Sequence, residues 1–266
     1  MNKKNLSNYV FENQVISFKS YISEFTEKIF NEFDEKSRKI NLQSKIDDLF
    51  NGKKVNNTES LAAWHPKYRN AKFDEDAIVK YFDLFKSAKN VITIGIGGSF
   101  EGPKLLLEAN GITNLNHIFI TGSDSEEFKL QTLNLKSNET IFIISSKSFK
   151  TDETIENLKN AISWSESIDN FIAVTANRSE ALKYNIKNII EFDQEIGGRY
   201  SIWSDISLAA HWENKTELKN NFILGGKKAD QDLLEDKNYL QFVKSLSFSD
   251  IWLHNFMNKN IRVVLS

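Results

Sequence analysis

The sequence predicts an α/β fold, a doubly wound domain built on a five-stranded parallel sheet, and three observations support this prediction. Five short apolar runs follow residue 90, beginning at Val91, His117, Thr140, Phe171 and Ile189. Each run is too short for a globular helix, is rich in β-branched residues and is nearly continuous in its apolarity, as expected for strands buried on both faces. Helical segments lie between the runs, and this alternation is typical of a parallel sheet covered by helices.

The residues before this domain are predicted to be helical. From Val15 onward, apolar residues recur in steps of three and four, at Phe18, Ile22, Phe25 and Ile29. This spacing places one apolar stripe on a helix. A polar stretch around residues 52–58 separates it from a second helical run over residues 78–85. We therefore expect the first 90 residues to be helical throughout.

Two helices are expected between the predicted strands. Pro103 stands at a suitable first helical position and leads to Leu105, Leu106 and Gly111. Further along, the apolar residues Ile155, Leu158 and Ile162 mark one face of another helix.

The last third of the chain is less regular. It contains GGRYSIWS, a helical stretch SDISLAAHW and a final apolar run, IRVVLS. The residues Ile261, Val263, Val264 and Leu265 predict a buried strand, yet no crossover helix follows to cover it. We expect the chain to be truncated on its C-terminal side, and a short natural edge strand is the alternative.

Composition excludes several classes of function. Of the 266 residues, 40% are hydrophobic and 26% charged, the balance of an ordinary soluble globular protein. With 34 Lys+Arg against 36 Asp+Glu, no strong global field favours a nucleic-acid or anionic-membrane partner. The absence of Cys excludes thiol nucleophiles, disulfides and iron–sulfur clusters. None of the four His residues stands in a metal-ligand spacing, so we expect no metal.

No targeting or membrane segment is recognisable in the sequence. No apolar run approaches the roughly 18 residues needed to cross a bilayer. The N-terminus, MNKKNLSNYV, lacks the apolar core of a signal peptide. We therefore expect a cytoplasmic protein without a membrane partner.

The first loop with functional potential follows the first predicted strand. It reads Gly95-Ile96-Gly97-Gly98-Ser99, and loops at the carboxyl ends of parallel strands are where open α/β sheets bind ligands. Glycines let backbone N–H groups approach an anion closely. Two nucleotide fingerprints fail here, because Phe100 replaces the third dinucleotide-binding Gly and Pro103 replaces the Walker Lys. A tight turn that only packs a helix on the sheet is the alternative.

The second loop follows the third predicted strand and gives the stronger signal. It reads SSKSFKT over residues 145–151, and Asp152 and Glu153 then open a helix. Several hydroxyls, one ammonium and free helix N-terminal N–H groups on one turn suit a phosphate monoester. The alternative is a capped helix, in which Thr151 caps and the two acids complement the dipole. Capping does not explain why the residues Ser146, Lys147 and Ser148 occur together.

The third loop, after the fifth predicted strand, contains Gly197, Gly198 and Arg199. Arginine is scarce in this Lys-rich chain. An Arg at a strand end, set after two flexible residues, can reach over a ligand and stabilise developing negative charge. A surface Arg beside a Gly pair is the alternative.

Taken together, the three loops resemble the glucose-6-phosphate isomerase family, also called the phosphoglucose isomerase family. The three segments that carry the resemblance are IGIGGSFEGP at residues 94–103, SSKSFKTDET at residues 145–154 and IGGRYSIWSDISL at residues 196–208. Upstream, NNTESLAAWHPKYR at residues 56–69 is similar to the family's Asn-x-Thr-Glu segment. The resemblance spans about residue 50 to the end.

The resemblance implies a fold and a domain division. The fold would be a sugar isomerase (SIS) domain with a five-stranded parallel sheet and the beginning of a second such domain. We expect an N-terminal helical segment at residues 1–75, the first SIS-like domain at residues 76–200 and the incomplete second one at residues 201–266. A homodimer is expected for a full-length member of the family.

The resemblance also implies an activity, the interconversion of glucose 6-phosphate and fructose 6-phosphate in glycolysis and gluconeogenesis. The residues that would hold the substrate phosphate are Ser146, Lys147, Ser148 and Thr151. Gly98 and Ser99 would line the sugar, and Arg199 would stabilise the cis-enediolate, whose charge appears only during the reaction. No cofactor is implied, since the proton shuttle uses side chains alone.

The sequence departs from the family pattern at several positions. Phe100 and Glu101 stand where the family usually has Asp-Leu, Ser148 stands where Thr is usual, and Lys150 replaces a residue that is commonly Thr. Lys150 would make the phosphate pocket more basic or would point away from it. The Glu base, the ring-opening His and the late Lys of the family have no counterpart, so we expect the 266-residue chain to be inactive alone.

Two other functions remain open at this stage. One is a sugar-phosphate-binding SIS module without catalysis, which the missing base favours. The other, a nucleotide-dependent enzyme built on the first loop, ranks below it because both fingerprints fail.

Overall fold

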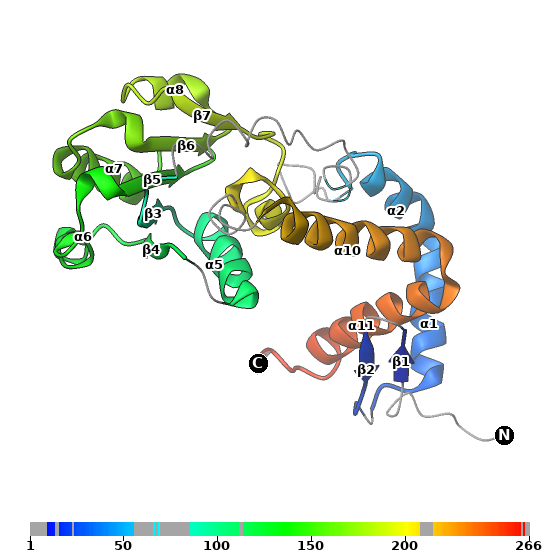
Figure 1. Cartoon of the computed structure of the whole chain (residues 1–266). Helices are drawn as coiled ribbons and strands as arrows, with labels where there is room; N and C mark the ends of the chain where they lie inside the picture. Colours follow the sequence, from blue (N-terminus) through cyan, green and yellow to red (C-terminus); the bar gives the residue numbers. More distant parts are fainter. Residues whose placement is uncertain are drawn as a thin grey trace. The chain divides into compact units, whose positions relative to one another are not determined.

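The computed structural model of the chain describes residues 10–13, 16–22, 24–55, 66, 69, 86–111, 114–207, 215–261 and 263. They form two compact units, which Figure 1 colours along the sequence. One unit contains the described residues up to Asp47 together with those from Gly225 onward, and the other runs from Asp48 to Leu224. The described residues from Gly225 onward therefore belong to the same unit as the N-terminal residues.

The second unit is a doubly wound α/β domain, as predicted. Its sheet contains five parallel strands in the order β4-β3-β5-β6-β7. The strands are β3 (Asn90–Ile94), β4 (Asn116–Ile120), β5 (Thr140–Ser145), β6 (Phe171–Thr175) and β7 (Asn188–Glu191). The chain moves from β3 to one side for β4 and then to the other side for β5, so the strand order reverses between β3 and β5. This reversal is the position at which such sheets bind ligands.

The continuous apolarity of the strand sequences follows from their burial. Every residue of β3, β5 and β6 is buried, because helices cover both faces of the sheet. The edge strand β4 is only partly buried. In the centre of the sheet, Phe142 stacks on Phe171 with the ring centres 4.6 Å apart. A strand with two buried faces has no polar side, and this is why no period-two alternation is visible in the sequence.

Helices cover the two faces of this sheet separately. On one face, α5 (Gly98–Asn110) and the short 3-10 helices η4 (Gly198–Trp203) and η5 (Asp205–Ser207) surround a core that includes Leu106 and Ile206. On the other, α6 (Ser125–Thr132), α7 (Asp152–Trp164) and α8 (Arg178–Leu182) bury Phe128, Leu158 and Ala181 against the sheet. Two further 3-10 turns, η2 (Ser137–Glu139) and η3 (Ile168–Asn170), lead into β5 and β6.

The helix expected to start at Pro103 begins five residues earlier, at Gly98. Gly97, with φ at +56°, turns the chain out of the first loop and lets the helix start immediately. Pro103 therefore lies inside α5, where it has no N–H to donate to the carbonyl of Ser99. This early start brings Gly98 and Ser99 into the first turn of a helix instead of a free loop.

The first unit is mainly helical. Its elements are the strands β1 (Val10–Glu12) and β2 (Ser17–Lys19) and the helices α1 (Glu27–Lys39), α2 (Leu42–Phe50), α10 (Lys215–Glu235) and α11 (Lys237–Asn255), of which α2 and α10 extend beyond the unit. Phe30 of α1 packs on Phe248 of α11, and a partly buried ion pair joins the same helices, with Lys244 Nζ 2.8 Å from Asp34 Oδ1. These contacts explain why residues so distant in sequence form one unit.

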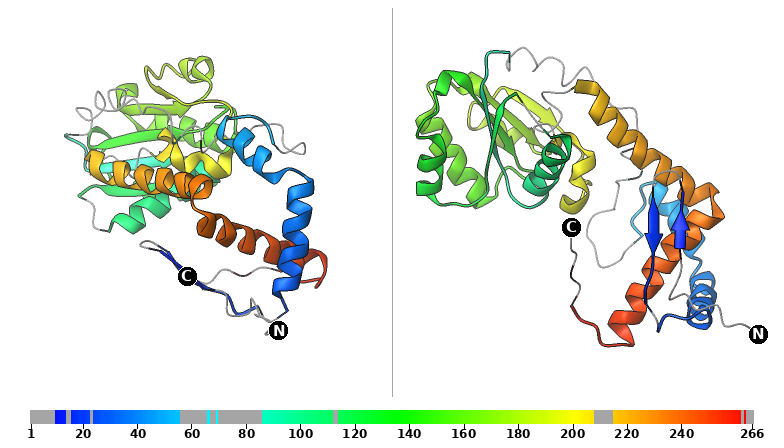
Figure 2. Two further views of the ribbon diagram at one scale, coloured as in Figure 1. Left: turned by 90° about the vertical axis from the view of Figure 1, so that its right-hand side faces the viewer. Right: turned by 60° about the horizontal axis from the view of Figure 1, so that its bottom comes forward.

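The helix predicted from Val15 to Ile29 is wrong for its first half. Residues 17–19 form β2, which pairs antiparallel with β1 in a hairpin that places Phe11 opposite Phe18. Figure 2 shows the two strands alongside α11, where Phe11 stacks on Phe242. Helix α1 starts at Glu27, after Thr26 Oγ1 accepts a hydrogen bond from the Ile29 N–H at 3.4 Å. The apparent helical stripe combined Phe18 of β2 and Ile29 of α1 with Ile22 and Phe25, which lie in the segment between them.

Other expectations meet the structure only in part. The helical run at residues 78–85 lies outside the described residues, and so do Val264 and Leu265 of the expected final strand. The described residues Ile261 and Val263 lie in no strand and are 86% and 72% exposed. Of the stretch SDISLAAHW, residues 205–207 form η5 directly after Ser204, and residues 208–212 are not described. Among the helices in the described ranges, none has the length and apolarity needed to cross a bilayer.

Candidate functional site

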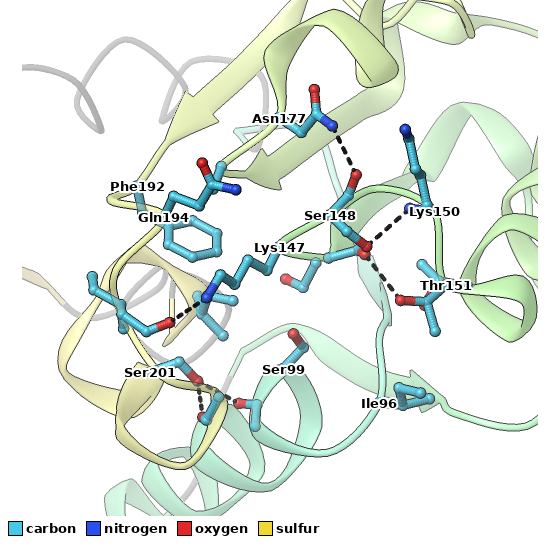
Figure 3. A pocket seen from close by; sticks show the side chains of 18 residues that line it. Ile96, Ser99, Lys147, Ser148, Lys150, Thr151, Asn177, Phe192, Gln194 and Ser201 are labelled. Atoms are coloured by element: carbon cyan, nitrogen blue, oxygen red, sulfur yellow. Dashed lines mark hydrogen bonds between the residues drawn. The ribbon is translucent and has the colours of Figure 1, made fainter. Parts of the chain in front are cut away.

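The three loops singled out in the sequence meet at one cavity in the α/β unit. The cavity has a volume of about 640 Å³ and lies at the carboxyl ends of the strands (Figure 3). Six of the predicted site residues line it: Gly98, Ser99, Ser146, Lys147, Ser148 and Thr151. The second loop supplies most of its polar atoms. Loops 50 residues apart in sequence are thus brought together by the reversal of strand order between β3 and β5.

The second loop is held from below by Phe149. This residue has a positive φ of 53°, which is uncommon for a bulky side chain, and its ring is only 1% exposed in the core beneath the loop. The Phe149 N–H donates to Ser146 Oγ at 3.1 Å. Ser146 Oγ in turn lies 3.5 Å from Thr151 Oγ1. A buried anchor at the tip of the turn therefore fixes the hydroxyls that face the cavity.

Thr151 stands at the N-cap position of α7, but its side chain makes no capping hydrogen bond. The interpretation of Thr151 as a simple capping residue is therefore wrong. Its hydroxyl lies beside that of Ser146 and lines the cavity instead. Without a side-chain cap, the N–H groups of the first turn of α7 are available to an anion, and the helix dipole favours negative charge at this end.

The ammonium of Lys147 connects the second loop to the third. Lys147 Nζ donates to the Ile196 carbonyl at 3.0 Å, as Figure 3 shows. Burial lowers the pKa of Lys147, and the carboxylates of Glu195 and Asp193 partly offset this effect. A cation that has lost part of its hydration gains more from an anionic ligand than an exposed one does.

Lys150 points away from the centre of the cavity. Its ammonium lies 3.3 Å from Glu180 Oε1 on α8, and Figure 3 shows the side chain extending away from Lys147. Glu180 therefore balances the charge of the residue that replaces the family's usual Thr. The backbone N–H of Lys150 donates to Ser148 Oγ at 3.2 Å, which holds this hydroxyl at the rim of the cavity.

Gly98 of the first loop is required by close packing against the third loop. A Cβ on Gly98 would lie 2.0 Å from the Gly198 carbonyl oxygen and 2.7 Å from Ser201 Oγ, so only glycine fits. Ser201 Oγ donates to the Gly198 carbonyl at 2.6 Å and to the Gly98 carbonyl at 3.2 Å. The contact at Gly98 thus joins the first loop to the third and forms one wall of the cavity, whereas the alternative expected from the sequence was packing of a helix on the sheet.

Arg199 is not brought together with the other predicted residues. Its side chain is exposed, and its guanidinium carbon lies 4.8 Å from the ring centre of Tyr200. Gly198 and Ser201 on either side of it line the cavity, whereas Arg199 does not. Tyr200 thus holds the cation beside the cavity by a cation–π contact. From the upstream segment the structure describes Pro66 and Arg69, and the guanidinium of Arg69 lies 4.4 Å from the ring centre of Trp203 in η4.

The cavity also contains residues that sequence reasoning missed. The polar ones are Ser145, Thr154, Asn177 and Gln194. Asn177 follows the carboxyl end of β6, so the rule that located the other loops would have found it. Its amide donates to the Ser148 carbonyl at 3.1 Å and so supports the second loop. No signal in the sequence reveals that Ser145 and Thr154 are among the residues that line the cavity.

The chemistry of the lining is that of an anion site. Among the described residues around the cavity, none is Asp, Glu or His. In the part of the chain that the structure describes, no three His, Cys, Asp or Glu side chains gather as metal ligands would. Hydroxyls, amides and one partly buried ammonium can bind a phosphate, but none of them is suited to remove a proton from carbon.

Comparison with known proteins identifies the family. Residues 80–266, which is well over half of the chain, match the sequence profile of phosphoglucose isomerase. The chain belongs to the phosphoglucose isomerase family. The glucose-6-phosphate isomerase of Buchnera aphidicola (subspecies Schizaphis graminum) is 29% identical over 293 residues, which cover 96% of this chain and 52% of that protein. The corresponding enzyme of Kluyveromyces lactis is 27% identical, over 90% of this chain and 50% of its own length.

Solved structures show the same fold. A glucose-6-phosphate isomerase from Chlamydia trachomatis superposes with a TM-score of 0.77 at 15% identity, over 91% of this chain and 53% of that one. A hypothetical protein from Thermus thermophilus superposes with a TM-score of 0.66 at 20% identity, over 86% and 55% of the two chains. The 266-residue chain spans about half the length of the curated relatives it matches. Its α/β sheet is thus the fold of phosphoglucose isomerases.

Proposed function

We propose that this protein interconverts glucose 6-phosphate and fructose 6-phosphate, and that the 266-residue chain carries the phosphate-binding half of the active site. One observation supports this above all. Three segments that the family match covers converge on a single cavity whose hydroxyls and ammonium suit a phosphate monoester. Membership of the family gives the reaction, and the cavity gives the place where its substrate would bind.

The second loop would bind the phosphate. Ser146, Ser148 and Thr151 offer hydroxyl donors, the first turn of α7 offers N–H groups, and Lys147 offers the positive charge. A phosphate monoester carries a charge of about −1.5 to −2 at neutral pH, so one ammonium and a helix dipole neutralise most of it. Gly98 and Ser99, on the opposite wall, would lie along the sugar.

Besides the phosphate-binding residues, the reaction needs a base and a group that stabilises negative charge. A base removes the proton from C2 of the open-chain sugar, the electron pair of that bond forms the C1=C2 double bond, and negative charge develops on the C1 oxygen. Transfer of the C2 hydroxyl proton to the C1 oxygen and return of the first proton to C1 complete the change from aldose to ketose. No electron is gained or lost, so no cofactor is required. Arg199 would swing from Tyr200 over the cavity and stabilise the enediolate oxygen.

The lining of the cavity supports a second candidate, a sugar-phosphate-binding module without catalysis. Its specific support is that no Asp, Glu or His lines the cavity in the described part of the chain. Such a site would bind fructose 6-phosphate and release it unchanged.

One experiment distinguishes the two functions. Fructose 6-phosphate is titrated into the 266-residue chain by calorimetry, and glucose 6-phosphate formation is followed by a coupled dehydrogenase assay. We expect saturable binding without turnover by this chain, and turnover by the protein expressed from its complete gene. Binding without turnover by both proteins would favour the non-catalytic module. Absence of binding by both would overturn the site itself.

Three broader features of the protein are part of the same proposal. Residues 76–200 would be the first SIS-like domain and residues 201–266 the beginning of the second. The full-length protein would be a homodimer in the cytoplasm, as the family resemblance implies. Sedimentation of the complete gene product would test the dimer.

A further inference from the structure

Two buried hydroxyls of the cavity have no hydrogen-bond partner. Ser145 Oγ and Thr154 Oγ1 both make no hydrogen bond within the described structure. Ser145 is 1% exposed and Thr154 is 2% exposed, yet both residues line the cavity beneath the second loop. Neither residue is among those that the family resemblance implies for the phosphate.

The energetics of burial make such a pair unusual. Most buried polar side chains in folded proteins have a partner, because a buried group left unsatisfied costs about 1–3 kcal/mol. Other buried hydroxyls of this unit follow that rule. Thr132 Oγ1 donates to the Phe128 carbonyl at 2.8 Å, and Thr175 Oγ1 donates to the Lys147 carbonyl at 3.2 Å. The two unpaired hydroxyls are therefore suited to a partner that enters the cavity.

Their position indicates what that partner is. Ser145 is the last residue of the central strand β5, immediately before the phosphate loop, and Thr154 lies in the first turn of α7. Gly95 packs closely on Ser145, since a Cβ there would lie only 2.7 Å from the Ser145 carbonyl oxygen. Both hydroxyls thus lie at the reversal of strand order and at the positive end of a helix.

We propose that Ser145 and Thr154 bind the phosphate group of the ligand from the floor of the cavity, as donors additional to Ser146, Ser148 and Thr151. This inference rests on the proposed sugar-phosphate site and adds two specific residues to it. Because these donors are already desolvated in the free protein, each bond to an anionic oxygen gains energy without a further desolvation cost for the hydroxyl.

The test is calorimetric titration of the 266-residue chain with fructose 6-phosphate and, separately, with inorganic phosphate. Ser145→Ala and Thr154→Val remove the hydroxyls at nearly constant volume. We expect each variant to lower the affinity for both ligands about tenfold or more, as loss of a charge-assisted hydrogen bond predicts. The thermal unfolding midpoint of the free variants should be unchanged or raised, because an unsatisfied group has been removed.

Thr132→Val is the matched control. Its hydroxyl has a partner in the fold and lies outside the cavity lining, so this variant should lower the unfolding midpoint and keep wild-type affinity. Lys147→Ala reports on the site as a whole. Loss of affinity in Lys147→Ala but not in Ser145→Ala or Thr154→Val would overturn the inference and leave the proposed function standing.

Two further outcomes would also contradict the inference. A loss of affinity for fructose 6-phosphate but not for inorganic phosphate would place the two hydroxyls on the sugar. No binding of either ligand by the folded wild-type chain would overturn both the proposed roles of Ser145 and Thr154 and the phosphate site. Conversely, both variants binding the ligands more weakly would support the proposed roles of Ser145 and Thr154. If the protein expressed from the complete gene also lacks isomerase activity, the proposed reaction is contradicted while these roles stand.

Discussion

The second and third loops of the site are built in opposite ways. The second loop is fixed through a side chain, because Phe149 is buried in the core and sets the hydroxyls above it. The third loop is fixed through its backbone, because Gly198 packs against Gly98 and Ser201 bonds to both. The side chain proposed to act in the reaction, Arg199, is exposed and lies against Tyr200. The loop proposed to bind the phosphate is thus anchored in the core, whereas the side chain proposed for the reaction lies outside the cavity lining.

The largest effect should come from the charge of the second loop. Lys147→Ala should weaken fructose 6-phosphate binding about 10- to 100-fold, because a hydrogen bond to a charged group is worth about 1.5–3 kcal/mol. Lys150→Ala removes the same charge from a side chain already paired with Glu180, and should change the affinity less than about threefold. Equal losses of affinity in the two variants, measured by calorimetry, would show that binding depends on the net charge around the cavity and not on the position of the ammonium.

The next largest effect should come from the backbone contact between the first and third loops. Gly98→Ala places a methyl group 2.0 Å from the Gly198 carbonyl oxygen, and should destabilise the α/β unit by about 1–3 kcal/mol, the usual cost of overpacking. Gly198→Ala is the matched control from the same contact, since a Cβ there meets nothing within 4 Å. Denaturant unfolding measures both. A tolerated Gly98→Ala would mean that the two loops can separate without cost.

Arg199 should have little effect on binding. Because it does not line the cavity, Arg199→Ala should change the affinity of the chain for fructose 6-phosphate less than about threefold. In the protein expressed from its complete gene, the same change should lower kcat more than it raises KM, because the enediolate charge exists only during the reaction. Steady-state kinetics separate these effects, and a change confined to KM would place Arg199 in ground-state binding.

The smallest effect should be a pH dependence caused by Lys147. Its pKa is lowered by burial, so phosphate binding should weaken as the pH rises through a value below that of an ordinary lysine. The free chain should show the opposite trend in stability. Between the folded and unfolded pKa values the unfolded chain binds more protons, so folding should become more favourable as the pH rises. Lys147→Met should abolish both trends, as titrations and thermal unfolding over alkaline pH would show.

How much of the fold the sequence could predict depends on whether an element leaves a local pattern. The five strands were predicted because burial on both faces leaves a continuous apolar signal, and the loops after them followed from the direction of parallel strands. The hairpin of β1 and β2 was missed because three-residue strands are too short to display a period, and the aromatic contacts that stabilise it come from α11.

Within the site, residue types were predictable but orientations were not. A run of Ser, Lys and Thr after a strand predicts an anion site, and six predicted residues do line the cavity. The direction of Arg199 depends on its contact with Tyr200, and the unpaired state of Ser145 and Thr154 depends on what surrounds them in space. Three-dimensional packing decides such features, and no local pattern encodes them.

The hydrogen bonds of Ser201 also bear on how the site is made during synthesis. The second loop closes over a few residues, as the bonds between Ser146, Phe149 and Thr151 show, and loop closure over so short a span is rapid. The bond from Ser201 to Gly98 joins positions 103 residues apart. At a ribosomal rate of about 5–20 residues per second, the second loop can form seconds before its opposite wall. A nascent chain would therefore have the turn proposed to bind phosphate before the opposite wall of the cavity exists, and we expect the ligand to stabilise only the finished domain.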